Sequence, residues 1–392
     1  MDQHGVAWTE LKNQFFSRYA TSSTLPDVFF APGRINILGE HLDYNGGYVL
    51  PCALGIGTYL AIRRRKDKRI FMASAGYNEI FEGEPEHLPG KSSNYWWNYP
   101  LGVMHELHLN ESDNQGVEMQ FASNLPTGVG LSSSASIELV TAFALNEILE
   151  KALSLQELAL LCRRAENDFV GVQCGIMDQY AVAFGKKDQA LFFNTKHLVH
   201  ELVPVHLGDY LFLISDTNTR RQLESTAFNE RYQECRAALK TMQRLLNVQE
   251  IADASPEAFE EMENWFPDES ARKRARHIVF ENERVKQGAA DLRDGKVEEL
   301  AGLMNASHES ARDNYEISCF ELEALIGAAL ASPGCLAARI SGAGFGGCTL
   351  NLVNKMKADE FMQETRSRYR NATGITAMFY PVEIGSGVSM IK

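Results

Sequence analysis

The sequence predicts an α+β fold divided into two lobes. With 392 residues, of which 45% are hydrophobic and 23% charged, the chain is too long for one ordinary core and has a globular composition. Its first half mixes strand-like runs with two helical segments, and its second half is rich in helices between strand-like runs. We place the boundary near residues 195–210, which gives lobes of residues 1–200 and 201–392.

Hydrophobic periodicity predicts the individual elements. Residues 1–20 predict an amphipathic helix whose apolar side includes Leu11 and Phe15. Strand-like runs follow at residues 48–54, 57–62 and 117–121. Helices are expected at 137–148 and at 154–169, where a Ser154–Glu157 capping box opens the second. Beyond the boundary we expect a strand at 211–217, helices at 226–304, and a strand, a glycine-rich turn and a strand at 340–353.

The charge balance argues against several classes of partner. Asp and Glu total 51 against 38 Lys and Arg, which gives a formal net charge of −13 and disfavours binding to nucleic acid or to an anionic membrane.

The first residues lack the pattern of a signal peptide, and no apolar run approaches the ~18 residues of a membrane span. The seven scattered cysteines contain no C-x-x-C pair. We therefore expect a cytoplasmic protein with reduced thiols.

Residues 125–136, LPTGVGLSSSAS, precede a predicted helix and suit the binding of phosphate. Gly128 and Gly130 let the backbone approach a ligand, serine hydroxyls can donate hydrogen bonds, and a helix N-terminus attracts anions. The segment is not a P-loop, because no lysine follows its glycines. The alternative is a serine-rich helix cap, which this segment alone does not exclude.

Residues 341–348, SGAGFGGC, match the G-x-G-x-x-G pattern. A strand-like run rather than a helix follows them, so we reject the interpretation as a dinucleotide site. The glycines either pack against another loop or face a ligand.

Residues 32–47, PGRINILGEHLDYNGG, gather four charged or polar side chains in a short stretch. Arg34 can stabilise phosphoryl charge, whereas Glu40, His41 and Asp43 can hydrogen-bond a ligand with several hydroxyl groups. The alternative is a polar turn with a surface ion pair.

Two further carboxylates are candidates for the site. Glu166 lies at the edge of the apolar side of the second predicted helix, so we expect it to lean inward, although a solvated helix face is the alternative. Asp178 follows Ile176 and Met177, which indicates partial burial and a need for a charged partner such as Arg34.

Taken together, PGRINILGEH, PTGVGLSSSAS and SGAGFGGC resemble, in this order, the three signature motifs of the GHMP small-molecule kinases. Within that superfamily GEHLDYNGG, VLPCAL and CGIMDQ are similar to the galactokinase family, and the resemblance covers essentially the whole chain. It implies a two-lobed GHMP kinase fold with the active site between the lobes. It also implies transfer of the γ-phosphoryl group of ATP to the C1 hydroxyl of α-D-galactose, with Mg²⁺ as the cofactor.

The resemblance assigns roles position by position. Asp178 matches the catalytic aspartate and Arg34 the catalytic arginine, while Ser134 and Glu166 match the residues that bind Mg²⁺. The positions that match sugar contacts are Arg34, Glu40, His41, Asp43, Gly175, Asp178 and Phe228. The positions that match the ATP site are Trp96, Gly128, Val129, Gly130, Leu131, Ser132, Ser133, Ser134 and Ala135.

Two positions depart from the usual pattern of the family. Leu42 stands where galactokinases usually have threonine, and Phe228 stands where a tyrosine usually contacts the sugar. Loss of one tyrosine hydrogen bond weakens sugar binding by roughly 0.5–1.5 kcal/mol. Tyr232, one helical turn further on, is a candidate to compensate.

Two alternatives to galactose phosphorylation stay open on the sequence. One is a GHMP kinase for another sugar, such as N-acetylgalactosamine, arabinose or a uronic acid, although the acidic Glu40 and Asp43 disfavour a uronate. The other is a regulator that binds galactose and ATP without catalysis, which the presence of all four catalytic and metal-binding positions disfavours. The expected partners are a small sugar and ATP, and we expect a monomer or a weak oligomer.

Overall fold

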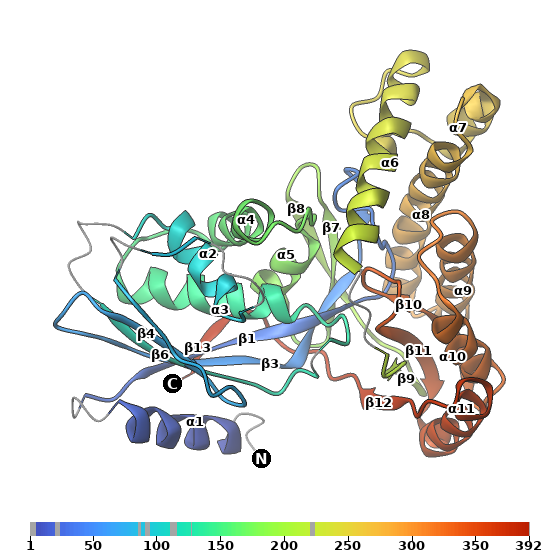
Figure 1. The fold of residues 1–392 in the computed structure, drawn as a ribbon. Coiled ribbons are helices and arrows are strands. Elements are labelled where there is room, and N and C mark those ends of the chain that lie inside the picture. The colour runs from blue at the N-terminus through green and yellow to red at the C-terminus, as the bar shows by residue number, and fades with distance from the viewer. Residues whose placement is uncertain are drawn as a thin grey trace.

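The computed structural model describes residues 5–19, 24–84, 88–90, 95–109, 116–126, 128–219 and 224–391, and three β-sheets organise this part of the chain (Figure 1). The first sheet has the strand order β13-β1-β3-β6-β4-β5. Its strands are β1 (Asp27–Asn36), β3 (Pro51–Arg64), β4 (Ile70–Ser74), β5 (Phe81–Gly83), β6 (Val117–Ser123) and β13 (Ser389–Ile391). All neighbours in it are antiparallel except β4 and β6. Since β13 is the last strand of the chain, this sheet contains segments from both ends.

Helices cover both faces of the first sheet, because alternate side chains of its strands point to opposite faces. On one face lies α1 (Gly5–Arg18), whose Leu11 and Phe15 are buried with Val28 and Phe30 of β1. The other face carries α2 (Asn98–Glu106), α3 (Ser133–Ile148), α4 (Leu155–Arg164) and α5 (Met177–Phe184) (Figure 1). A smaller sheet pairs β2 (Tyr48–Val49) with β7 (Gln189–Asn194), and β7 with β8 (Val199–Pro204).

The second half is a four-stranded antiparallel sheet with six helices among the described residues (Figure 1). Its strands, in sheet order, are β10 (Cys335–Ser341), β11 (Cys348–Asn354), β9 (Tyr210–Asp216) and β12 (Met378–Pro381). Its helices are α6 (Glu224–Leu245), α7 (Pro256–Met262), α8 (Glu269–Asp294), α9 (Val297–Asp313), α10 (Phe320–Leu330) and α11 (Ala358–Thr373). Short 3₁₀ turns lie at Ile251–Asp253, Glu263–Trp265 and Lys355–Lys357.

The predicted α+β fold is confirmed, with two corrections to its elements. Residues 51–64 form one strand, so the runs 48–54 and 57–62 are not two separate strands. The reason is Gly57, where an added Cβ would lie 2.0 Å from the carbonyl oxygen of Ala31, so this glycine allows close strand approach and marks no turn. The helix at 154–169 is α-helical only to Arg164 and continues as a π-helix at Ala165–Val170.

The other predicted elements are found close to their expected positions. The N-terminal helix spans Gly5–Arg18, while residues 1–4 and 20 of that prediction lie outside the described residues. The division at residue 200 stays a prediction. Among helices in the described part of the chain, none is both long and apolar enough to cross a membrane.

A buried ion pair ties the second half to the first. Arg339 on β10 donates hydrogen bonds to the carboxylate of Glu40 and to the main-chain oxygens of Asn36 and Ile37, the latter two at 3.1 and 2.9 Å. The side chains of Arg339 and Glu40 are 1% and 2% exposed. Loss of the guanidinium would leave the buried carboxylate of Glu40 without its charged partner and the carbonyl groups of Asn36 and Ile37 without this donor.

Replacement of Arg339 by methionine should therefore lower the free energy of unfolding by about 3–5 kcal/mol. Urea denaturation of the two proteins measures this difference. The control is Arg368→Met, which removes an ion pair whose side chains are both 49% exposed, and its effect should stay below about 1 kcal/mol. Equal effects of the two substitutions would contradict the role given to Arg339.

Candidate active site

A cavity of about 300 Å³ lies where the two halves meet. It brings together the three motif segments, the π-helix and the start of α5. Its lining residues are Arg34, Glu40, His41, Asp43, Tyr44, Ser134, Glu166, Val172, Cys174, Gly175, Met177, Asp178, Phe228, Gly342 and Ala343. All nine catalytic, metal and sugar positions proposed from the sequence therefore share one cavity.

A β-bulge places Arg34 at this cavity. The register between β1 and β3 shifts between Pro32 and Arg34, which re-aims the side chains that follow. An added Cβ at Gly33 would lie 2.6 Å from the carbonyl oxygen of Leu131, so only glycine lets the serine-rich loop approach β1 this closely. The amide of Arg34 donates a hydrogen bond to that same oxygen at 3.2 Å.

Arg34 and Asp178 form a two-point ion pair inside the cavity. Nε and Nη2 of Arg34 each donate to one carboxylate oxygen of Asp178 at 2.9 Å, and Nη1 donates to the carbonyl of Gly130 at 2.6 Å. The Asp178 side chain is 27% exposed against 6% for Arg34. Asp178 therefore has a fixed orientation and still faces the open part of the cavity.

Ser132 adds a third hydrogen bond to the Asp178 carboxylate, at 2.5 Å. It stands at the N-cap of α3 in the left-handed region, with φ of +59°, and its side chain makes no cap hydrogen bond. The interpretation as a helix cap is thus wrong for Ser132. Its neighbours Ser133, which is exposed, and Ser134, which is half-buried, stay at the N-terminus of α3.

The third motif packs against the second. A Cβ added at Gly342 would lie 3.2 Å from the carbonyl oxygen of Gly130. A Cβ added at Gly347 would lie 3.3 Å from the carbonyl oxygen of Val129. The amide of Gly342 donates to the Glu40 carboxylate at 3.2 Å, and Gly342 also lines the cavity. The packing of this glycine-rich turn against another loop is therefore confirmed, whereas its contact with a ligand stays a prediction.

Asp43 and Gly175 fit each other closely. An added Cβ at Gly175 would lie 2.0 Å from Oδ2 of Asp43, and the amide of Met177 donates to that oxygen at 3.1 Å. Burial raises the pKa of Asp43 from 3.8 to about 6, and the nearby negative charge of Asp178 adds to the rise. Glycine is required at position 175 because the carboxylate of Asp43 occupies the space that a side chain at this position would need.

Glu166 is buried in the π-helix and leans inward, as expected. Its Oε2 accepts a hydrogen bond from Nε2 of Gln179 at 2.7 Å. Burial raises the pKa of Glu166 to about 7, the charge of Asp178 raises it further, and hydrogen bonds from Ser134, Cys174 and Gln179 oppose the rise. The hydroxyl of Ser134 and this carboxylate thus form an adjacent pair of oxygen groups.

This pair fits Mg²⁺ better than a metal that needs a full cage of protein ligands. Within the described ranges, no three His, Cys, Asp or Glu side chains are grouped to hold a metal ion. Mg²⁺ keeps several waters and is commonly bound by one or two protein oxygens together with substrate phosphates. Ser134 and Glu166 meet that requirement.

Sequence reasoning missed Glu138 of α3, which lies behind Glu166. Gln179 connects the two carboxylates, since its Nε2 also lies 3.4 Å from Oε2 of Glu138. Burial raises the pKa of Glu138 well above its usual value, and the charge of Glu166 adds to the rise. The available signal was a charged residue between Ala135, Leu139 and Ala142 on an otherwise apolar helix face.

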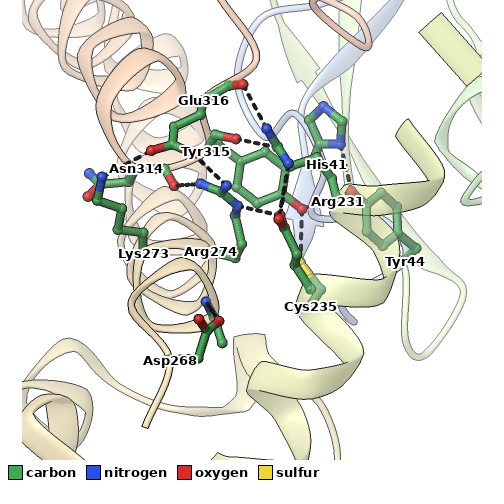
Figure 2. A network of polar contacts seen from close by, with 12 residues as sticks. His41, Tyr44, Arg231, Cys235, Asp268, Lys273, Arg274, Asn314, Tyr315 and Glu316 are labelled. Atoms are coloured by element: carbon green, nitrogen blue, oxygen red, sulfur yellow. Dashed lines mark hydrogen bonds and ion pairs between the residues drawn. The ribbon is translucent and has the colours of Figure 1, made fainter. Parts of the chain in front are cut away.

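His41 lies in the left-handed region, with φ of +62°, and both its ring nitrogens contact protein groups. Nδ1 is 2.6 Å from the hydroxyl of Tyr44 (Figure 2). Nε2 is 3.1 Å from the carbonyl oxygen of Ala343. Burial lowers the pKa of His41 to about 3, so the ring is neutral. Tyr44 also lines the cavity and was not predicted.

Of the two positions that depart from the family pattern, one lines the cavity and the other lies in the core. Phe228 lines the cavity, and its ring centroid is 5.3 Å from that of His41. Leu42 is fully buried in the core, so its substitution removes no group from the cavity. Tyr232 lines a neighbouring cavity of about 290 Å³ with Tyr44, and its compensating role stays a prediction.

Trp96 does not line the cavity that holds Arg34 and Asp178. Its ring packs on Phe121 of β6, with centroids 5.5 Å apart. Its place beside the adenine, like the roles assigned to residues 128–135, stays a prediction.

Three family models match the chain. The galactokinase galactose-binding signature matches residues 13–64, the GHMP kinases N terminal domain matches residues 98–186, and the GHMP kinases C terminal model matches residues 289–371. A galactokinase from Clostridium tetani is 42% identical over 379 residues, which cover 96% of each chain. A galactokinase from Enterococcus faecalis is 40% identical over 380 residues, 96% of this chain and 98% of the relative.

Solved structures agree with these matches. A crystal structure of Lactococcus lactis galactokinase complexed with galactose has a TM-score of 0.95 and 37% identity, and the match covers 98% of this chain and 100% of that one. The Methanococcus jannaschii mevalonate kinase has a TM-score of 0.65 at 17% identity, covering 95% and 100%, which supports the fold alone.

The raised pKa of Asp43 predicts a pH-dependent stability. The folded protein keeps the proton of this carboxyl up to about pH 6, whereas the unfolded chain releases it near pH 3.8. Stability from this group is thus lost as the pH rises through that window, because the unfolded state binds fewer protons there. Urea denaturation should show the unfolding free energy of the wild type falling relative to Asp43→Asn over this range, and a difference independent of pH would contradict the assignment.

Proposed function

The chain belongs to the galactokinase family, and from this premise and the geometry of the cavity we propose which of its residues carry the reaction. The enzyme transfers the γ-phosphoryl group of ATP to the C1 hydroxyl of α-D-galactose, which gives galactose 1-phosphate and ADP. The observation that carries the proposal is the two-point pair of Arg34 and Asp178, placed between the sugar-side and the phosphate-side segments of one cavity.

Asp178 receives the C1 hydroxyl. Its carboxylate accepts hydrogen bonds from Arg34 and Ser132 and is exposed toward the cavity, so it can orient the hydroxyl and accept its proton as the oxygen attacks phosphorus. In a loose transition state the nucleophile is deprotonated late, so orientation contributes a large part of the effect.

Arg34 links this carboxylate to the phosphate loop. The same guanidinium bonds Asp178 and the carbonyl of Gly130, so its positive charge lies between the acceptor and the phosphoryl donor. A fixed charge in a partly water-excluded site stabilises the negative charge that spreads over the transferring group.

Residues 128–135 bind the triphosphate. Gly128 and Gly130 have φ of +74° and +82°, which allows close approach of the backbone, and the N-terminus of α3 faces the same region. Ser134 and Glu166 hold Mg²⁺, whose contribution when bound is to neutralise phosphate charge. Trp96 lies beside the adenine, with its ring against Phe121.

The sugar-side wall is formed by Glu40, His41, Asp43 and Phe228, with Gly175 behind Asp43. The two carboxylates accept hydrogen bonds from hydroxyl groups, which suits a neutral sugar and disfavours a uronate. Phe228 offers an apolar ring where the family usually has a hydroxyl.

We also propose that the enzyme acts in the cytoplasm, as a monomer or a weak oligomer. Its seven cysteines are all free thiols in the structure, which supports a reducing compartment.

Replacement of Asp178 by asparagine keeps the shape of the side chain and removes the proton acceptor. Turnover should fall by roughly 100- to 10,000-fold, while galactose still binds. A coupled assay for ADP measures turnover and isothermal titration calorimetry measures sugar binding, with Asp168→Asn, an exposed aspartate in the π-helix, as the control. Turnover like that of the wild type in Asp178→Asn would refute the role.

Replacement of Glu166 by glutamine should raise the Mg²⁺ concentration for half-maximal activity by roughly tenfold or more, because one charged ligand is lost. The KM for galactose should change little, since this carboxylate faces the phosphate side. A Mg²⁺ titration at saturating ATP and galactose tests the assignment, and an unchanged Mg²⁺ dependence would exclude it.

A further inference from the structure

A row of hydrogen-bonded side chains runs from the sugar-side wall into the second half. The hydroxyl of Tyr44 lies 2.6 Å from Nδ1 of His41 and 2.8 Å from the hydroxyl of Tyr315. The Tyr315 hydroxyl in turn lies 3.0 Å from Sγ of Cys235 on α6 (Figure 2). At the other end of the row, Nε2 of His41 faces the carbonyl oxygen of Ala343 at 3.1 Å.

The carbonyl of Ala343 sets the direction of every bond in this row. A carbonyl oxygen can only accept, so Nε2 of His41 must carry a proton. In the neutral ring Nδ1 then has no proton and accepts from the hydroxyl of Tyr44. Because the Tyr44 hydroxyl donates its proton to His41, it must accept a hydrogen bond from the hydroxyl of Tyr315. The Tyr315 hydroxyl then has no proton left for Cys235, so it accepts from the thiol of Cys235.

Two arginines hold the main chain of Asn314 and Tyr315 in place (Figure 2). Nε of Arg231 donates to the carbonyl of Tyr315 at 2.9 Å, and Nη1 of Arg274 donates to the carbonyl of Asn314 at 2.5 Å. Both guanidinium groups also bond Glu234, at 3.0 and 2.7 Å, and the Arg274 side chain is 1% exposed. The row therefore ends in a rigid part of the second half.

The protonation states of the row agree with this direction. Burial lowers the pKa of His41 to about 3 and raises the pKa of Tyr44 and of Tyr315 well above their usual value. At neutral pH the imidazole is thus uncharged and both phenols keep their protons.

We propose that Tyr44 and Tyr315 are positioning residues that, with Cys235, hold the Nδ1 side of His41, so that the ring keeps the tautomer protonated at Nε2 that the Ala343 carbonyl sets, and the sugar meets His41 only by sharing this one N–H with that carbonyl. The inference rests on the proposed function, because it takes His41 as a sugar contact. The sugar oxygen that meets His41 must then act as an acceptor. Since Phe228 beside it offers no hydroxyl, this single donor carries more of the recognition.

The tautomer can be measured directly on the wild-type protein. Nitrogen-15 NMR of histidine-labelled protein, with His41 assigned by its absence from His41→Ala, reports which ring nitrogen carries the proton. The row predicts a protonated Nε2 and an unprotonated Nδ1 at about pH 7, with or without galactose. A protonated Nδ1 in either state overturns the inference, whatever the variants do.

A sugar panel separates positioning from general loosening of the site. With Tyr44→Phe and Tyr315→Phe, the KM for galactose should rise roughly three- to tenfold while kcat changes by less than about twofold. With 2-, 3-, 4- and 6-deoxygalactose, the increase should disappear for the one sugar that lacks the acceptor of His41. An equal increase for every sugar, or no increase, contradicts the inference.

Two controls make this comparison specific. Tyr19→Phe also removes a buried hydroxyl that bonds a carbonyl, that of Met119 at 3.0 Å, but lies on the α1 face of the first sheet, so it should leave every KM unchanged. Cys235→Ser keeps a donor to Tyr315 and should behave like the wild type in the whole panel.

Failure of this inference is distinct from failure of the proposed function. If the wild type neither binds nor phosphorylates galactose, the proposed function is wrong, and the NMR measurement still decides the tautomer. If galactose is bound and phosphorylated but Tyr44→Phe and Tyr315→Phe behave like Tyr19→Phe, only the inference is wrong.

Discussion

The ion pair of Arg34 and Asp178 joins three segments that are far apart in the sequence. One guanidinium bonds the carboxylate at the start of α5 through two N–H groups and the carbonyl of Gly130 through a third. Because Arg34 itself follows a bulge in β1, the strand, the phosphate loop and the helix keep one relative position. The reacting groups of a phosphoryl transfer need such fixed placement, since positioning and charge provide most of the catalysis.

The rest of the site depends on close backbone packing around that pair. Gly33 and Gly342 let the first and third motifs approach the second, and Gly175 leaves its side-chain space to Asp43. Arg339 then connects β10 to Glu40 and to the carbonyl groups at the end of β1, so the second half contributes to the cavity from a fixed position.

The sequence predicted which motif segments meet at the candidate site because glycine spacing, serine runs and clustered polar residues are local signals. It did not predict partners that only folding brings together, such as Arg339 for Glu40 or Tyr315 for Tyr44, since no local pattern indicates what lies opposite. Gly57 was taken as the first residue of a separate strand, although it lies inside one strand and serves close strand approach. Ser132 looked like a cap, and only the placement of Asp178 shows where its hydroxyl points.

A crystal structure with galactose, Mg²⁺ and a non-hydrolysable ATP analogue tests the central claim most directly. The account predicts the C1 hydroxyl of the sugar within hydrogen-bond distance of the Asp178 carboxylate, with Arg34 between that carboxylate and the γ-phosphate. A sugar bound with its C1 hydroxyl away from Asp178, or a γ-phosphate out of reach of that hydroxyl, would contradict it.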